Sequence, residues 1–124
     1  MIVEWQMNQS LLKEKSYAFA IRIVRLPRYL SEEKREYVLG KQILRSGTAI
    51  GALIWEAEYA ESRSDFIHKL HIALKEANET DYWLSLLKDT DSIDEKAWQS
   101  MRKDCTELIA LLVSSIKTLK KTKS

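Results

Sequence analysis

Turn-forming residues are almost missing from this chain, which has one proline and three glycines among 124 residues. An all-β fold needs turn residues at short intervals, whereas this sequence is rich in the helix formers Leu, Ala, Lys and Glu. With 45% hydrophobic and 31% charged residues, the composition is that of an ordinary globular protein. We therefore expect one domain made of long helices and few loops.

Apolar residues recur at helical spacing along most of the sequence. The periodic segments predict four helices, at about 10–29, 32–60, 65–89 and 94–120. We expect a single domain over residues 1–124 with an all-α fold, an antiparallel up-down-up-down four-helix bundle. This arrangement is the simplest way to bury four apolar stripes with short connections.

Local signals set the expected helix ends. Pro27 removes a backbone donor, so the first helix should bend or end near Leu26. Ser31 is followed by two glutamates, which makes it the expected N-cap of a second helix some 40 Å long at ~1.5 Å per residue. Ser64 is the expected N-cap of the third helix.

All three glycines fall inside the second predicted helix, where each costs roughly 1 kcal/mol relative to alanine. Gly40, Gly47 and Gly51 are spaced by seven and four residues, so they share one helix face. A close crossing with another helix explains this face better than a ligand groove does.

Several aromatic residues lie outside the main apolar stripes, namely Trp55 in the second predicted helix and Tyr82 and Trp83 in the third. Single exposed aromatic side chains are normal, but several together favour a subunit interface or a partner surface. The sequence therefore predicts an oligomer in preference to a monomer.

Residues suited to metal binding or catalysis are sparse. His68 and His71 lie three apart and could hold a metal with a carboxylate, but without a Glu-x-x-His pair a structural or surface role is the stronger interpretation. Cys105 lies on the apolar stripe of the fourth helix, where a buried thiol packs well. The sequence also lacks a phosphate-binding glycine loop and a paired-cysteine zinc motif. We predict a protein that is not an enzyme and has no metal or cofactor.

Basic residues gather on the first helix and early in the second. The net charge is only +2 and acidic neighbours offset many of these residues, so in a monomer they are best interpreted as a solvated face. A symmetric ring would multiply a weak patch into a strong field, to which phosphate backbones respond. The candidate nucleic-acid-binding residues are Arg22, Arg25, Arg28, Lys34, Arg35 and Lys41.

The expected location is the cytoplasm, without membrane insertion. No stretch approaches the roughly 18 to 20 apolar residues that a membrane span needs. The only cysteine cannot form an internal disulfide, and the first nine residues lack the pattern of a secretory leader.

Several runs of the second and third helices resemble the four-helix bundle family of proteins encoded in intervening sequences of 23S rRNA genes: 42–52, 56–57, 64–67, 72–80 and 82–84. That family includes the accessory variability determinant of diversity-generating retroelements. The resemblance covers nearly the whole chain from about Ser16. It implies a homopentamer with no cofactor and no established enzymatic activity. For the retroelement member it also implies a basic surface that binds nucleic acid and a reverse transcriptase.

The chain departs from the family pattern at Ala49 and Leu53, where the family usually has a serine and an asparagine. Any role that depended on that asparagine is therefore in doubt here. Arg45 and Glu56 are the remaining polar members of this block. They lie eleven apart on one helix face, and we interpret them as a structural or intersubunit charge network.

The leading prediction is a pentameric helical scaffold that binds RNA or an RNA–protein partner through basic surface residues. The alternatives are a protein-interaction module that docks a partner on exposed Trp and Tyr residues, and a metal enzyme built on His68 and His71. The expected helix-packing or oligomer contacts are Gly40, Arg45, Gly47, Gly51, Trp55, Glu56, Tyr82 and Trp83.

Overall fold

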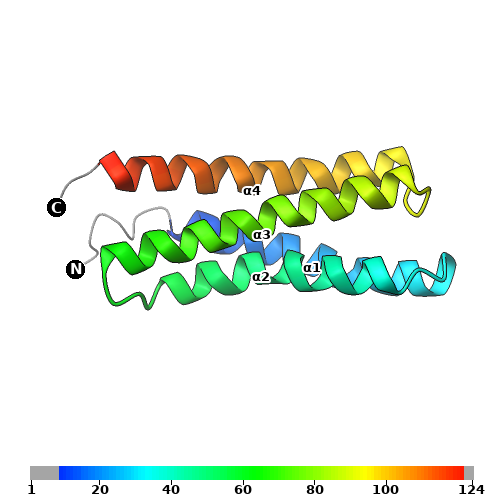
Figure 1. Ribbon diagram of the computed structural model, residues 1–124, viewed down its shortest axis with the longest axis horizontal. Helices are drawn as coiled ribbons and strands as arrows, with labels where there is room; N and C mark the ends of the chain where they lie inside the picture. Colours follow the sequence, from blue (N-terminus) through cyan, green and yellow to red (C-terminus); the bar gives the residue numbers. More distant parts are fainter. Residues whose placement is uncertain (1–8, 122–124) are drawn as a thin grey trace.

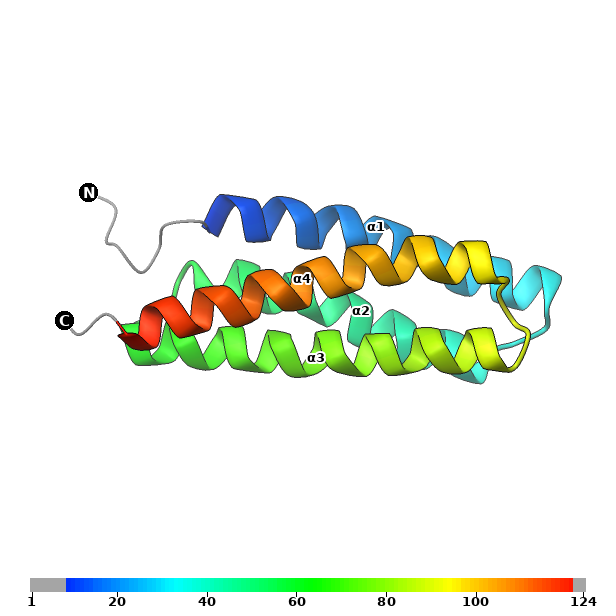
Figure 2. The same cartoon turned by 90° about the horizontal axis from the view of Figure 1, so that it is seen from above.

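The computed structural model describes residues 9–121, which form four helices joined by short connections. The helices are α1 (Gln9–Glu33), α2 (Val38–Ala57), α3 (Arg63–Asp89) and α4 (Glu95–Lys121). They run antiparallel along one long axis, with the α1–α2 and α3–α4 connections at the same end of the bundle (Figures 1 and 2). The all-α four-helix bundle predicted from the sequence is confirmed.

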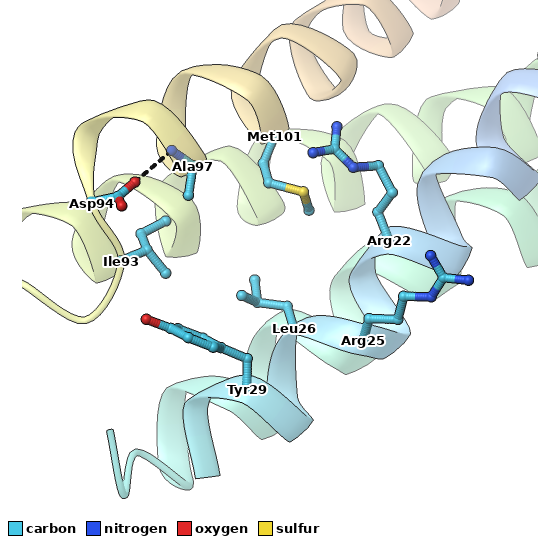
Figure 3. Close-up of a pocket in the computed structure, with 8 residues that line it drawn as sticks. All are labelled: Arg22, Arg25, Leu26, Tyr29, Ile93, Asp94, Ala97 and Met101. Atoms are coloured by element: carbon cyan, nitrogen blue, oxygen red, sulfur yellow. Dashed lines mark hydrogen bonds between the residues drawn. The ribbon is translucent and has the colours of Figure 1, made fainter. Parts of the chain in front are cut away.

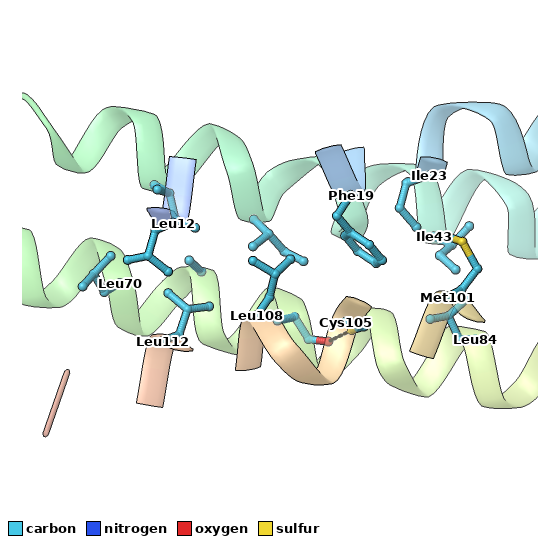
Figure 4. Packing of buried hydrophobic residues seen from close by; sticks show 14 of the residues in the cluster. Leu12, Phe19, Ile23, Ile43, Leu70, Leu84, Met101, Cys105, Leu108 and Leu112 are labelled. Carbon is cyan, nitrogen blue, oxygen red and sulfur yellow. Dashed lines mark hydrogen bonds between the residues drawn. The ribbon is translucent and has the colours of Figure 1, made fainter. Parts of the chain in front are cut away.

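The core is a continuous apolar column between the four helices, because each helix turns one apolar stripe inward. Phe19 and Ile23 of α1 point toward Leu84 of α3 and Leu108 of α4 across this column (Figure 4). Contact between α1 and α4 is the least extensive of the neighbouring pairs. The side between α1 and α4 is therefore the most open side of the bundle.

Cys105 lies in the core, as its place on the apolar stripe predicted. Its thiol donates a hydrogen bond to the backbone oxygen of Ala77 at 3.3 Å. Burial, with a smaller contribution from Asp81, raises the pKa of the Cys105 thiol to about 12. The side chain is a neutral packing group at ordinary pH.

One pair of hydroxyls is buried between α2 and α3. Thr80 donates from Oγ1 to Ser46 Oγ at 2.9 Å, and both residues are fully buried. Because each hydroxyl has a partner, the pair satisfies the hydrogen-bonding requirement of a dry core.

The glycine face of α2 packs against α1. A Cβ added to Gly47 would lie 2.7 Å from Cγ2 of Ile23, which is closer than side-chain carbons approach in real proteins. At Gly40 an added Cβ would meet Pro27 at an ordinary distance of 3.6 Å. The tightest contact of the glycine face is therefore that of Gly47 with the side chain of Ile23, whereas at Gly40 and Gly51 the neighbouring atoms include the backbone of α1.

The predicted end of the first helix is wrong, because α1 continues through Pro27 to Glu33. Proline removes one N–H from the helix, and here its ring is held against Gly40, so packing offsets the loss. Ser31 lies inside α1, where its hydroxyl donates to the Arg28 backbone oxygen at 3.1 Å instead of capping α2. The chain turns at Arg35, whose φ of 54° lies in the left-handed region.

The second and third helices also begin at other residues than expected. α2 starts at Val38, where Glu36 Oε2 accepts a hydrogen bond from the Leu39 N–H at 2.8 Å. With 20 residues, α2 is about 30 Å long at 1.5 Å per residue, not 40 Å. Ser62, not Ser64, is the N-cap of α3, since its Oγ accepts from the Asp65 N–H at 3.0 Å.

Candidate functional site

Five of the six candidate nucleic-acid-binding residues are exposed cations without an ion-pair partner. Within residues 9–121, no carboxylate oxygen lies within 4.0 Å of their charged atoms. They lie in the second half of α1, in the α1–α2 connection and in the first turn of α2, toward one end of the bundle (Figure 2). We call this set the basic corner: Arg25, Arg28, Lys34, Arg35 and Lys41.

Arg22 differs from the other five. Its guanidinium donates to Oδ2 of Asp104 at 2.6 Å and to the hydroxyl of Ser100 at 2.8 Å. Together with the Lys15–Glu107 ion pair at 2.6 Å, it ties α1 to α4. Arg22 therefore has a structural contact within the chain, which the other five candidates lack.

Acidic residues stand close to the basic corner and limit its field in a single chain. The same end of the bundle carries Glu36 and Asp94, but the carboxylate of each accepts a backbone N–H at the start of a helix. Asp89 at the end of α3 and Asp91 of the α3–α4 connection have no cationic partner within 4.0 Å in the described part of the chain. One chain with a net charge of +2 is therefore a weak attractor of phosphate.

A hollow of about 410 Å³ lies between α1 and α4 on the open side of the bundle (Figure 3). Leu26, Ile93 and Met101 form its apolar floor, and Arg25 and Tyr29 lie at its rim. The lining combines this apolar floor with the charged side chains of Arg22, Arg25 and Asp94, so the hollow suits binding of an apolar group flanked by polar ones.

The outward side of α1 and α2 is apolar. We call this surface the outer face: Tyr17, Ile21 and Val24 of α1 with Leu44, Ala52 and Trp55 of α2. Tyr17 is 57% exposed, Val24 54% and Trp55 47%. The rings of Tyr17 and Trp55 have centroids 6.0 Å apart and border a shallow groove of about 260 Å³.

Of the outer face, only Trp55 is among the contact residues expected from the sequence. A signal for the others was present in the sequence, because the α1 run from Ser16 to Leu26 contains only two charged residues, Arg22 and Arg25. An isolated amphipathic helix on a bundle surface carries polar residues over its whole outward side. A search for missing polar positions on α1 would have found this surface.

The predicted contact residues Arg45, Glu56 and Trp83 form contacts within the chain. Arg45 of α2 forms ion pairs with Glu76 at 3.3 Å and with Glu79, and Glu79 Oε2 also accepts from the indole N–H of Trp83 at 2.9 Å. Glu56 pairs separately with Lys69 at 3.8 Å. Both Arg45 and Glu56 thus bridge α2 to α3, in two separate ion-pair groups.

Tyr82, Ala49 and Leu53, which the sequence also singles out, fall in two environments. Tyr82 is exposed on α3, with its ring in edge contact with Trp83 at a centroid distance of 5.0 Å. Ala49 and Leu53, at the positions where the family has polar residues, are partly buried.

The two histidines do not form a metal site. His68 is exposed and His71 half-buried on α3. Across residues 9–121, no three His, Cys, Asp or Glu side chains come together in a way that could hold a metal ion.

No described helix is long and apolar enough to cross a bilayer.

Comparison with known proteins gives one family and a close structural relative. The family model described as "23S rRNA-intervening sequence protein" matches residues 8–114. A similar solved structure is that of a protein of unknown function from the S23 ribosomal protein family of Bacteroides thetaiotaomicron VPI-5482. It is 56% identical over 90% of this chain and 99% of that chain, with a TM-score of 0.87. No curated protein matches the sequence.

Proposed function

Because the chain belongs to the 23S rRNA-intervening sequence protein family, we propose that it is a homo-oligomeric scaffold, pentameric and not enzymatic, that binds RNA or an RNA–protein partner. The observation that supports the RNA proposal is the basic corner, where five exposed cations lack an acidic partner among the described residues. Phosphate groups on a nucleic acid are the natural counter-charges for such a cluster.

Assembly supplies the charge that one chain lacks. A pentamer would carry a net charge of about +10 and repeat the basic corner five times around its axis. Summed fields of this kind draw in phosphate backbones even where each patch is weak. The proposal therefore makes RNA binding depend on assembly.

Two observations support a role without catalysis. The Cys105 thiol is buried in the core and stays neutral, and the hollow between α1 and α4 brings no nucleophile beside a base. The free thiol of Cys105 also suits the reducing cytoplasm, where we place the protein.

The test of the RNA proposal is a titration of a fluorescent mixed-sequence single-stranded RNA, followed by anisotropy at increasing salt. If each bound chain neutralises about five phosphates, affinity should fall by roughly 100-fold between 50 and 200 mM salt. The variant Arg28→Glu/Lys34→Glu should abolish binding without changing helicity or oligomer mass. Lys96→Glu/Lys103→Glu changes the charge of exposed α4 lysines by the same amount and should retain more binding. Equal loss in both variants would contradict the choice of the basic corner.

A second candidate function is a protein-interaction module without a nucleic-acid role. The exposed Tyr17 and Trp55 of the outer face favour it, because Tyr and Trp are enriched at protein interfaces. A reverse transcriptase is the protein partner that the resemblance to the retroelement determinant suggests. Binding of a protein that persists at high salt, with no RNA binding at low salt, would favour this function over the first.

A further inference from the structure

The side of α1 that faces α4 carries a second apolar surface. Lys15 and Arg22, which reach α4, mark this side of the helix. Three exposed residues lie at helical spacings from them: Leu11 and Ala18, four before and three after Lys15, and Tyr29, seven after Arg22. Together with Ala97 of α4 and the apolar floor of the hollow, they form what we call the seam: Leu11, Ala18, Leu26, Tyr29, Ile93, Ala97 and Met101.

We propose that the outer face of one copy of this chain packs against the seam of the next copy, with the copies parallel, in a closed ring that has α1 at its inner corner. This inference rests on the proposed homo-oligomer and adds the two surfaces that build it. The contact is head-to-tail, since the two surfaces of one subunit are different.

The size of the outer face is that of an interface. The exposed parts of its five large side chains amount to roughly 500 Å², more than half of the ~800 Å² that each partner buries in a standard protein interface. The largest apolar patch of a typical monomer is itself about 300–600 Å² and is often functional. A second apolar surface on the same helix is not explained by a single contact between two chains.

The shapes of the outer face and of the seam also favour a neighbouring copy packed on each. The groove of the outer face is lined by small and aromatic residues without a charged group, so it suits an apolar side chain of a neighbour: Tyr17, Ala20, Thr48, Gly51, Ala52 and Trp55. The hollow of the seam has an apolar floor of Leu26, Ile93 and Met101 (Figure 3).

The positions of the two surfaces predict ring closure. The outer face spans α1 and α2, and the seam spans α1 and α4, so they are adjacent sides of a bundle with α1 as the shared corner. Adjacent sides of a square bundle face about 90° apart, and cyclic rings of four and five need contact surfaces about 90° and 108° apart. A second copy on each surface therefore leads to a small closed ring.

Charge favours a neighbouring copy in the same orientation, although the hollow of the seam is not acidic overall, because Arg22, which is paired with Asp104, and Arg25 line it beside Asp94. Lys41 of the basic corner lies one helical turn from Leu44 of the outer face, whereas Asp94 lines the seam. Both lie toward the end of the bundle that holds the α1–α2 and α3–α4 connections (Figure 1). Parallel copies bring these opposite charges to the same height, and inverted copies separate them.

The ring would also concentrate the basic corner. With α1 at the inner corner, Arg25 and Arg28 of every copy are gathered around the ring axis. Two guanidinium groups per chain then act together on one RNA strand, which is the charge multiplication that the proposed function requires.

The experiment uses two single substitutions, each of which blocks one surface. Ala52→Glu places a carboxylate in the groove of the outer face. Ala97→Glu places one at the seam, in the first turn of α4 where a negative charge favours the helix, so the fold is preserved. Ser114→Glu, at an exposed position of α4 that belongs to neither surface, is the matched control. Absolute mass is measured by light scattering, with helicity measured by circular dichroism.

The expected mass of the wild-type protein and of Ser114→Glu is that of the ring, and each blocking variant should fall to the mass of one chain with unchanged helicity. An equimolar mixture of the two variants should form a species of two chains, because each contributes the surface that the other lacks. Ring mass retained by Ala97→Glu, or a mixture that stays at the mass of one chain, would overturn the head-to-tail contact. A monomeric wild-type protein would overturn it as well.

RNA titration of the same proteins separates this inference from the proposed function. If the masses follow the expectation but the wild-type ring does not bind RNA, the surfaces stand and the RNA proposal fails. If a wild-type oligomer binds RNA and neither blocking variant changes its mass, the RNA proposal stands and the surfaces are wrong.

Discussion

Replacement of Gly47 by alanine tests whether the close approach of α1 and α2 governs this bundle. In an open helix the substitution would stabilise by roughly 1 kcal/mol, because alanine is the better helix former. Here the new Cβ would lie 2.7 and 2.8 Å from two carbons of Ile23. These atoms belong to a β-branched side chain with a stiff χ1, so they cannot turn away easily.

The expected net effect is destabilisation. Overpacking of a dense core costs typically about 1–3 kcal/mol, which offsets the gain in helix propensity and leaves a net loss of up to about 2 kcal/mol. Gly40→Ala is the matched control, since its Cβ would meet Pro27 at an ordinary 3.6 Å and should leave stability unchanged or slightly higher.

Urea denaturation at one fixed protein concentration gives the free energies, because association would make stability depend on concentration. In an Ile23→Ala background the clash disappears, so Gly47→Ala should then become stabilising. This reversal of sign is the coupling that a double-mutant cycle measures. If Gly47→Ala stabilises the wild-type protein as much as Gly40→Ala does, the reasoning from the close approach is refuted.

Two further predictions follow from single contacts. At pH 8 a thiol with a pKa of about 12 has roughly 1000-fold less thiolate than a thiol at the ordinary pKa of 9.0. Cys105 should therefore resist a thiol reagent until denaturant is added. Rapid labelling of the native protein would contradict the burial of Cys105. Ser62→Ala removes the N-cap of α3 and should lower the unfolding free energy by about 1 kcal/mol, whereas Ser64→Ala should have little effect. The opposite order of the two variants in urea denaturation would show that Ser64 is the N-cap.

The fold could be predicted from the sequence because helical periodicity is a local property. The end of α1 could not, since it depends on Pro27 resting against Gly40, and the two are on different helices. A cap signal at Ser31 was outweighed by that packing.

The candidate site was predicted only in part, because pairing depends on distant residues. Arg22 and Arg25 are alike in the sequence, yet Arg22 meets Asp104, which is 82 positions away, and Arg25 has no such partner among the described residues. The apolar outward side of α1 is visible in the sequence as a shortage of charge. Only the structure shows which neighbouring helices share it.

The buried hydroxyls of Ser46 and Thr80 have a consequence for how identical copies can match. If α3 slid along α2 by one helical turn, about 5.4 Å, Ser46 would lose its partner at a cost of about 1–3 kcal/mol, whereas Thr80 would keep its hydrogen bond to the Glu76 backbone oxygen within α3. Apolar contacts alone would tolerate such a slide much better. The pair thus fixes the axial register of the helices, so every molecule presents its surfaces at the same heights, as a symmetric assembly of identical parts requires.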